Sequence, residues 1–122
     1  MRASRGEIKI EEVLRSAGVV FQEEYSFPDL VSTSGRPLRF DFAVFDDENN
    51  LEFLIEYQGI QHYNPKSKFG GYVGLHKQQY NDMKKREYCK KNNIILIEIP
   101  YTVEGRINYD YIMNLYYSKG GY

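Results

Sequence analysis

Hydrophobic residues at helical spacing lie near the start of the chain. The residues that would share one helical face are Ile10, Val13, Leu14 and Ala17. Ser4 and Glu7 have the S-x-x-E spacing of a capping box, in which both side chains accept hydrogen bonds from free backbone amides. Gly18 follows the last apolar residue, a position where helices commonly end. The pattern therefore predicts a first helix between Ser4 and Gly18.

Alternating apolar and polar residues follow and predict strands. Residues 19–27 are rich in β-branched and aromatic side chains, and Pro28 is expected to end this strand. Two further alternating runs, residues 38–44 and 51–56, are separated by the polar segment 46–50. We expect these two runs to form an antiparallel hairpin.

The second half of the chain predicts two helices and one more strand. Residues 58–74 are dense in glycine and proline, which indicates a long loop of the kind that often carries function. Residues 75–91 predict a helix, and the aliphatic run 94–99 predicts a strand buried on both faces. A tyrosine-rich helix is expected over residues 108–117. The order α-β-β-β-α-β-α indicates an α/β fold in which an antiparallel meander leads through a helix to one more strand.

Length and composition indicate how many domains the protein has and where it is located. A chain of 122 residues, 42% hydrophobic and 27% charged, indicates a single globular domain over residues 1–122. No run approaches the roughly 20 apolar residues that cross a bilayer, and the N-terminus lacks the apolar stretch of a signal peptide. Cys89 is the single cysteine, so neither an internal disulfide nor a structural zinc is expected. An intracellular location follows from this reasoning.

The net charge of -1 conceals two opposed blocks. Residues 41–56 contain six acids and no base, whereas residues 66–91 contain eight bases and two acids. Such patterning is either ordinary surface charge or a cation site beside a surface that binds a polyanion. Composition alone leaves both interpretations open.

Two acids of the predicted hairpin are candidates for the cation site. Asp41 lies within its first strand and Glu56 near the end of its second, positions that antiparallel pairing can bring together. Two carboxylates about 4 Å apart repel by roughly 4 kcal/mol at an effective dielectric of about 20, a penalty that a divalent cation reverses. Oxygen ligands favour Mg²⁺ or Mn²⁺. The alternative is that both acids face solvent on an exposed hairpin.

The segment EYQGIQHY, residues 56–63, strengthens the case for a site. It places Gln58, Gln61 and His62 directly after Glu56, at a strand exit that contains glycine. Strand exits and loops carry a large share of binding and catalytic residues. His62 is well placed to exchange a proton at a phosphate, although a lone histidine is more often a surface residue.

One stripe of the second predicted helix combines apolar ends with polar residues. Its members are Leu75, Gln79, Asp82, Arg86 and Cys89. Polar groups on an inward face need partners. Either Asp82 and Arg86 pair within the helix, or Asp82 orients His62 or a water while Arg86 lies near a phosphate. Glu7 presents a similar choice, between its capping box and the inward face of the first helix.

These residues resemble the PD-(D/E)xK nuclease superfamily. Asp41 on one strand and Glu56-Tyr57-Gln58 on the next match its carboxylate motif. Five residues resemble the EDxHD pattern of its very-short-patch-repair-like branch, which includes phage homing endonucleases: Glu7, Asp41, Glu56, His62 and Asp82. The similarity covers about residues 4–101. It implies a restriction-endonuclease-like αβββαβ core, here with an additional C-terminal helix, that hydrolyses DNA phosphodiester bonds with Mg²⁺.

The resemblance also implies residue roles. Asp41 would be the main metal ligand, with Glu56 and the Tyr57 carbonyl as further contacts. His62 would act as general base or position the water, and Asp82 and Glu7 would support it or hold metal-bound waters. Supporting polar residues would be Gln58, Gln61 and Gln79. The bases expected to contact DNA are Lys66, Lys68, Lys77, Lys84, Lys85 and Arg86.

The sequence departs from the superfamily pattern at two positions. Phe40 stands where a proline is usual and Gln58 where a lysine is usual, so metal, Arg86 or loop lysines would have to meet the transition-state charge. Mismatch-repair members of the branch carry a structural zinc that one cysteine cannot ligate in the same way, which favours the homing type. Those members have a separate DNA-recognition region, expected outside this chain. A double-strand break would require a symmetric dimer on DNA.

The sequence therefore predicts a Mg²⁺-dependent endonuclease acting on double-stranded DNA, with Mn²⁺ as the second metal to consider. We expect a homing-type enzyme, encoded by a phage or its bacterial host. Three alternatives stay open. They are a very-short-patch-repair-like nicking enzyme, a nuclease fold retained only for DNA binding with Gln58 marking lost catalysis, and a globular interaction domain whose tyrosines fill core and interface.

Overall fold

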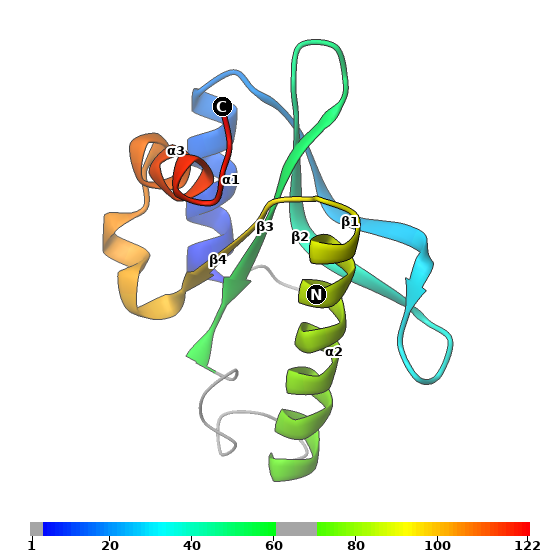
Figure 1. Cartoon of the computed structure of the whole chain (residues 1–122). Helices are drawn as coiled ribbons and strands as arrows, with labels where there is room; N and C mark the ends of the chain where they lie inside the picture. The colour runs from blue at the N-terminus through cyan, green and yellow to red at the C-terminus, as the bar shows by residue number, and fades with distance from the viewer. Residues whose placement is uncertain (1–3, 61–70) are drawn as a thin grey trace.

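The protein has a mixed α/β fold in which a four-stranded sheet lies between helices (Figure 1). The computed structural model describes residues 4–60 and 71–122. Its elements are α1 (Arg5–Ser16), β1 (Val20–Val31), β2 (Pro37–Phe45), β3 (Leu51–Gln58), α2 (Gly71–Lys91), β4 (Leu96–Pro100), the 3₁₀ helix η3 (Tyr101–Arg106) and α3 (Tyr109–Ser118). The predicted order of helices and strands is confirmed, with η3 as an unpredicted addition. In the described residues, no helix is long and apolar enough to cross a membrane.

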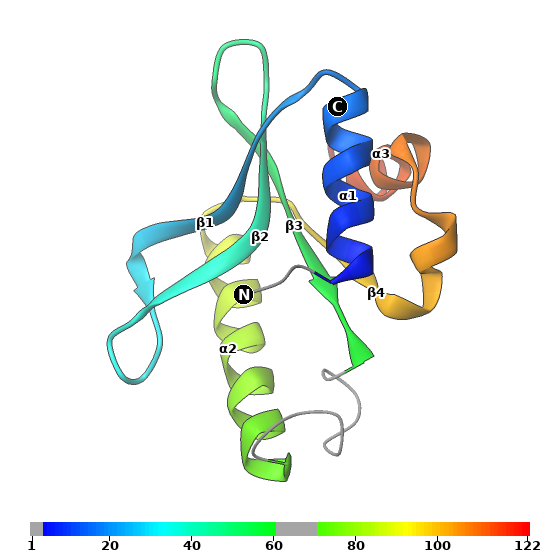
Figure 2. The same ribbon diagram turned by 180° about the vertical axis from the view of Figure 1, so that it is seen from behind.

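The strand order is β1-β2-β3-β4, antiparallel through the first three strands and parallel between β3 and β4. Helices α1 and α3 cover one face of the sheet, and α2 covers the other, as the two opposite views show (Figures 1 and 2). The core between the sheet and α1 and α3 is the larger of the two and contains Ile10, Leu14, Ile97, Ile112 and Tyr116. Among the described helices, α2 is the one that packs on the second face of the sheet.

Local sequence signals set the ends of α1 and the β2–β3 turn. The Ser4 side chain accepts a hydrogen bond from the Glu7 amide, and the Glu7 side chain accepts one from the Ser4 amide, so the predicted capping box is confirmed. Gly18, with φ of 72°, follows the C-terminus of the helix. In the turn, Asp46 Oδ1 accepts hydrogen bonds from the amides of Glu48 and Asn50. The predicted hairpin is therefore confirmed.

The path of β1 differs from the prediction. The strand does not end at Pro28 but continues to Val31, because β1 is an edge strand and a proline there need not donate to the ladder. Glu24 has φ of 51°, and it lies opposite Asp41 between the Glu23–Phe42 and Tyr25–Phe40 pairs. The strand pair bends at this point.

The bend changes which face of the sheet receives the hydrophobic residues of β2. Uniform alternation would have placed Phe40 and Phe42 on the same face. Instead, Phe40 packs in the α2 layer, whereas Phe42 packs in the layer of α1 and α3. Asp41 therefore lies at the crossover between the two cores.

The strand β4 also differs from its prediction. Ile97 and Ile99 are fully buried on the α1 and α3 side, but Leu96 and Glu98 on the other face are half-buried. The expected burial on both faces is wrong because β4 is an edge strand that α2 covers incompletely. The half-buried face leaves room for an acidic side chain, Glu98, beside the helix.

Helix α2 contacts the sheet through polar groups as well as apolar ones. Among its side chains of known burial, Leu75 and Cys89 are the buried ones. Tyr88 Oη donates a 2.7 Å hydrogen bond to Asp29 Oδ1 on β1, and Lys84 Nζ donates to the Val31 carbonyl. Burial raises the pKa of the Cys89 thiol to about 12, so this cysteine is a small hydrophobic residue here and not a nucleophile.

Gly6 provides a test of the packing between α1 and β3. A Cβ atom at Gly6 would lie 2.0 Å from Cζ of the Tyr57 ring, which is buried and whose hydroxyl donates to Glu104. We expect Gly6→Ala to lower the free energy of unfolding by about 1–3 kcal/mol in urea denaturation, because the ring must move. Gly105→Ala is the matched control, since its Cβ would meet nothing within 4 Å. Equal losses in both variants would contradict this packing.

Candidate active site

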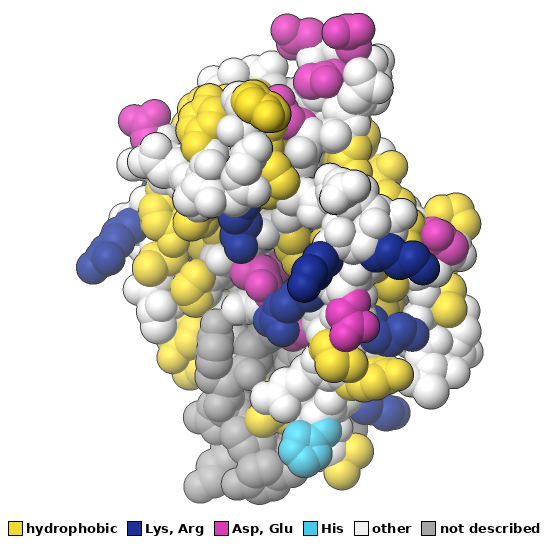
Figure 3. Space-filling view, in the orientation of Figure 1, with side chains coloured by type: hydrophobic (Ala, Val, Ile, Leu, Met, Phe, Trp, Pro, Cys, Tyr) yellow, Lys and Arg dark blue, Asp and Glu magenta, His cyan; other side chains and the backbone are white. Residues whose placement is uncertain are grey.

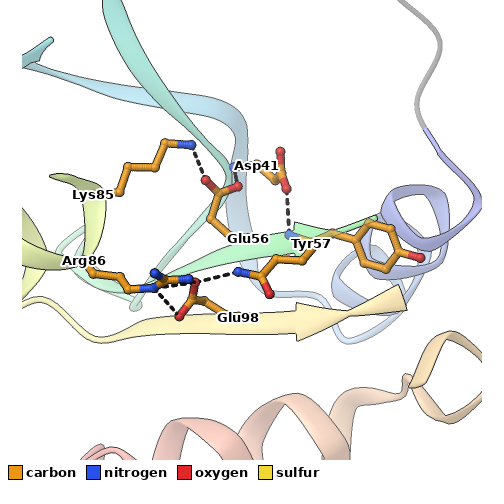
Figure 4. Close-up of polar contacts among 7 residues, drawn as sticks. Asp41, Glu56, Tyr57, Lys85, Arg86 and Glu98 are labelled. Atoms are coloured by element: carbon orange, nitrogen blue, oxygen red, sulfur yellow. Dashed lines mark hydrogen bonds and ion pairs between the residues drawn. The ribbon is translucent and has the colours of Figure 1, made fainter. Parts of the chain in front are cut away.

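The carboxyl groups of Asp41 and Glu56 lie where β2 and β3 stop pairing. The strands pair from Val44–Phe53 to Phe42–Ile55, so Asp41 and Glu56 would form the next pair. At this position, hydrogen bonds from backbone amides to side-chain carboxylates take the place of the backbone hydrogen bonds between the strands. The Tyr57 amide donates to Asp41 Oδ2 at 2.7 Å, and the Asp41 amide donates to Glu56 Oε2 at 3.4 Å (Figure 4). The structure thus brings together the two acids that the sequence predicted, and neither lies on an exposed hairpin.

Helix α2 supplies a cation to this pair. Lys85 Nζ forms an ion pair with Glu56 Oε1, and the two side chains are only 14% and 13% exposed (Figure 4). The ammonium group also lies 5.5 Å from the centre of the Phe40 ring. Lys85, predicted to contact DNA, therefore faces the interior of the protein and approaches the carboxylates.

A third acid, Glu98 on β4, extends the row. Glu98 lies beside Glu56 in the parallel register of β3 and β4. Gln58 Nε2 donates to Glu98 Oε1 at 2.7 Å, and Arg86 Nε donates to both carboxylate oxygens at 2.9 and 3.0 Å (Figure 4). Sequence reasoning missed Glu98. The available signal was one acid within an otherwise aliphatic strand.

The environment of Asp41 holds its carboxyl group in the protonated form at neutral pH. Its pKa rises from 3.8 to about 8, first because the group is buried, then because of the charge of Glu56 and a hydrogen bond between the two side chains. The Tyr57 amide opposes this rise, and the carboxylate of Glu7 adds to it. In the described part of the chain, Asp41 has no ion-pair partner, whereas Glu56 and Glu98 each have one.

Glu7 and Tyr57 border the site from the other side of the sheet. Glu7 is committed to its capping box, and its charge also contributes to the raised pKa of Asp41. Tyr57 Oη donates to Glu104 Oε1 at 3.1 Å, and burial together with this bond raises the pKa of Tyr57 to about 12. The backbone amide of Tyr57 holds the Asp41 carboxyl group in place, so Tyr57 is a positioning residue.

The remaining predicted residues are distributed along α2 or lie beyond the described residues. Gln79 is exposed, so its predicted inward direction is wrong, because the inner stripe of α2 runs through Lys85 instead. Asp82 is half-buried on the same helix. Arg86 pairs with Glu98 on β4. Predicted site residues outside the described residues are Gln61, His62, Lys66 and Lys68.

The donor set of this site fits a hard divalent cation. Within residues 4–60 and 71–122, no three His, Cys, Asp or Glu side chains form a group that could hold a metal. Two neighbouring carboxylates are nevertheless the usual protein contribution to Mg²⁺, whose other ligands are water and substrate phosphate oxygens. Asp41 and Glu56 supply such a pair. Burial first, and then the charge of Glu56, raise the pKa of Asp41, and a cation between the two groups would oppose both effects by stabilising the ionised form.

The raised pKa of Asp41 predicts a pH effect on stability. The unfolded chain releases this proton near pH 4 and the folded protein near pH 8, so the free energy of unfolding falls as pH rises between these values. Asp41→Asn cannot ionise. We therefore expect the wild type to lose stability relative to Asp41→Asn from pH 5 to pH 8.5, by up to about 1 kcal/mol per pH unit, in urea titrations with chelator. A difference that does not change with pH would contradict the assignment.

Comparison with known proteins relates the chain to viral proteins. It is 32% identical over 124 residues to uncharacterized protein 307L of Invertebrate iridescent virus 6, covering 91% of this chain and 63% of that protein. It is 45% identical over 73 residues to uncharacterized protein 094L of Frog virus 3, covering 58% of this chain and 44% of that protein. The chain spans less than two thirds of the length of these relatives. No family model and no solved structure matches the chain. It is thus similar to viral proteins whose names state no activity.

Proposed function

We propose that this protein is a metal-dependent DNA endonuclease of the PD-(D/E)xK type, with a restriction-endonuclease-like core. One observation carries the proposal: Asp41, Glu56 and Lys85 converge where β2 and β3 separate, beneath a helix that carries further bases. The order of elements and the parallel β3–β4 pair reached through α2 support the proposed fold. The function does not follow from the fold, and it rests on the chemistry of this site.

Asp41 and Glu56 would hold Mg²⁺ or Mn²⁺ in this proposal, and the Tyr57 carbonyl stays a predicted further contact. When bound, the metal supplies Lewis-acid stabilisation of charge on the phosphate. Asp41 must give up its proton for this role, since its pKa is about 8 in the protein alone. The burial of both carboxyl groups makes their attraction to a cation stronger than it would be in water.

Lys85 would supply the positive charge that Gln58 cannot. Gln58 is a neutral side chain committed to Glu98, whereas Lys85 reaches the same row of carboxylates from α2. An ammonium group fixed beside the scissile phosphate stabilises the negative charge that develops there without reorganisation of solvent. We assign to Lys85 the role that a lysine at position 58 would have had.

Proton transfer is assigned to residues whose roles stay predictions. His62 would accept a proton from the attacking water, and Asp82, which has a half-buried position on α2, would orient His62. Gln61 lies in the same segment as His62. The homing type, a separate DNA-recognition region, a symmetric dimer on DNA and an intracellular site of action are further parts of the proposal.

A supercoiled-plasmid assay with Mg²⁺, Mn²⁺ or chelator tests this function. We expect metal-dependent nicking or cutting by the wild type, and a loss of at least about 100-fold in Asp41→Ala and in Lys85→Met, because the first removes a proposed metal ligand and the second a cation beside the reacting phosphate. Glu12→Ala and Lys91→Met are matched controls, since both residues are exposed and lie away from the carboxylate row.

The outcome separates the proposed enzyme from its alternatives. Circular dichroism of each variant establishes that it is folded. Cleavage by both site variants at the wild-type rate would contradict the mechanism. Salt-dependent DNA binding without cleavage under any divalent ion would instead identify a nuclease fold retained for binding. If the wild type neither binds nor cleaves DNA, the result would favour a protein interaction domain.

A further inference from the structure

An open groove of about 560 Å³ lies between the turn that joins β1 to β2 and the first half of α2. One wall is the Ser32–Ser34 turn, and the other is the segment of α2 from Val73 to Asn81. Lys84 Nζ donates to the Val31 carbonyl, which fixes the turn to the helix at the end of the groove. The two walls of the groove, the β1–β2 turn and α2, are therefore joined by a hydrogen bond.

The polar groups of the groove are suited to a phosphate chain. They comprise three hydroxyl groups, an imidazole, an ammonium group and an amide, from Ser32, Thr33, Ser34, His76, Lys77 and Asn81. The Ser32 and Ser34 hydroxyls hydrogen-bond to each other at 2.9 Å, so one of these two donors is used within the turn. The other groups can each donate a hydrogen bond, and the described lining contains no carboxylate. Figure 3 shows Lys and Arg side chains over α2 on the face seen in Figure 1, with some Asp and Glu side chains among them. This combination favours a ligand with many acceptors and negative charge.

Two exposed apolar side chains complete the groove. Val73 is 70% exposed and Tyr80 is 47% exposed, although large apolar side chains in this protein are mostly covered. Lys84 Nζ lies 5.9 Å from the centre of the Tyr80 ring and helps to position it. Nucleic-acid surfaces commonly combine cations along the backbone with aromatic rings against sugars or bases.

We infer that this groove binds the sugar–phosphate backbone of DNA on one side of the scissile phosphate. The inference rests on the proposed nuclease function and adds where the substrate lies. Lys77 precedes Lys85 by eight residues of α2, or about 12 Å along the helix. On the other wall, the groove residues Ser32–Ser34 precede the start of β2 at Pro37, which is itself four residues, or about 13 Å, from Asp41. Lys77 and the start of β2 thus lie about three to four base steps from the carboxylates, at about 3.4 Å per step.

The groove also divides the bases of α2 by role. Lys84 and Arg86 contact the Val31 carbonyl and Glu98, so these two bases position the helix, and Lys85 pairs with Glu56 in the proposed active site. Lys77 is exposed in the groove. Among the described bases predicted to contact DNA, the geometry therefore assigns the backbone contact to Lys77.

Fluorescence anisotropy with a short labelled duplex in chelator tests the groove, because binding is measured without cleavage. We expect Lys77→Ala to weaken binding about five- to tenfold and to reduce the slope of log K against log salt by about one. Thr33→Val should weaken binding about two- to fivefold with an unchanged slope, because it removes a neutral donor of the same shape. Lys9→Ala, at an exposed lysine on α1 in the opposite layer, should bind like the wild type.

The inference is overturned if either groove variant binds like the wild type, or if Lys9→Ala loses as much affinity as Lys77→Ala. Its failure can be told apart from failure of the proposed function. DNA binding with the expected variant pattern but no cleavage under Mg²⁺ or Mn²⁺ would remove the nuclease and keep the groove. Metal-dependent cleavage by the wild type, with normal DNA binding by both groove variants, would keep the nuclease function and remove the groove as a DNA-binding site.

Discussion

The architecture of this protein centres on two carboxyl groups that the sheet forces together. Asp41 and Glu56 lie where β2 and β3 stop pairing. In place of the backbone hydrogen bonds between the strands, the Asp41 amide donates to the Glu56 carboxylate and the Tyr57 amide donates to the Asp41 carboxyl group. Burying two acids at one point is unfavourable unless protons or cations compensate. In this molecule a proton on Asp41 and the ammonium group of Lys85 provide that compensation.

The same requirement explains how α2 docks. Three acids run across the sheet on β2, β3 and β4, and two consecutive bases of α2 meet the second and third of them. These contacts, the Tyr88–Asp29 hydrogen bond and the packing of Cys89 and Tyr88 on the sheet together set the register of the helix. The groove beside the β1–β2 turn is a consequence, since that register also fixes the distance between Lys77 and the carboxylates. Fold and proposed chemistry thus share one set of interactions.

Local signals in the sequence predicted much of the fold, and long-range ones predicted less. The capping box of α1 and the polar turn of the hairpin involve neighbouring residues, so their spacing was sufficient. The proximity of Asp41 and Glu56 followed from hairpin geometry. The bend at Glu24, which sends Phe40 and Phe42 to different cores, has no signature in the alternation of β2. The inward direction of Lys85 depends on how α2 docks, which a helical pattern with no continuous apolar face does not determine.

Calorimetric titration with Mn²⁺ at pH 7, in buffers of different ionisation enthalpy, tests the central claim most directly, because it counts the protons released on binding. With a pKa of about 8, Asp41 is mostly protonated at this pH and must lose its proton to hold a cation beside Glu56. The account predicts release of close to one proton by the wild type and much weaker binding, without proton release, by Asp41→Asn. Equal affinity and equal proton release in the two proteins would contradict it.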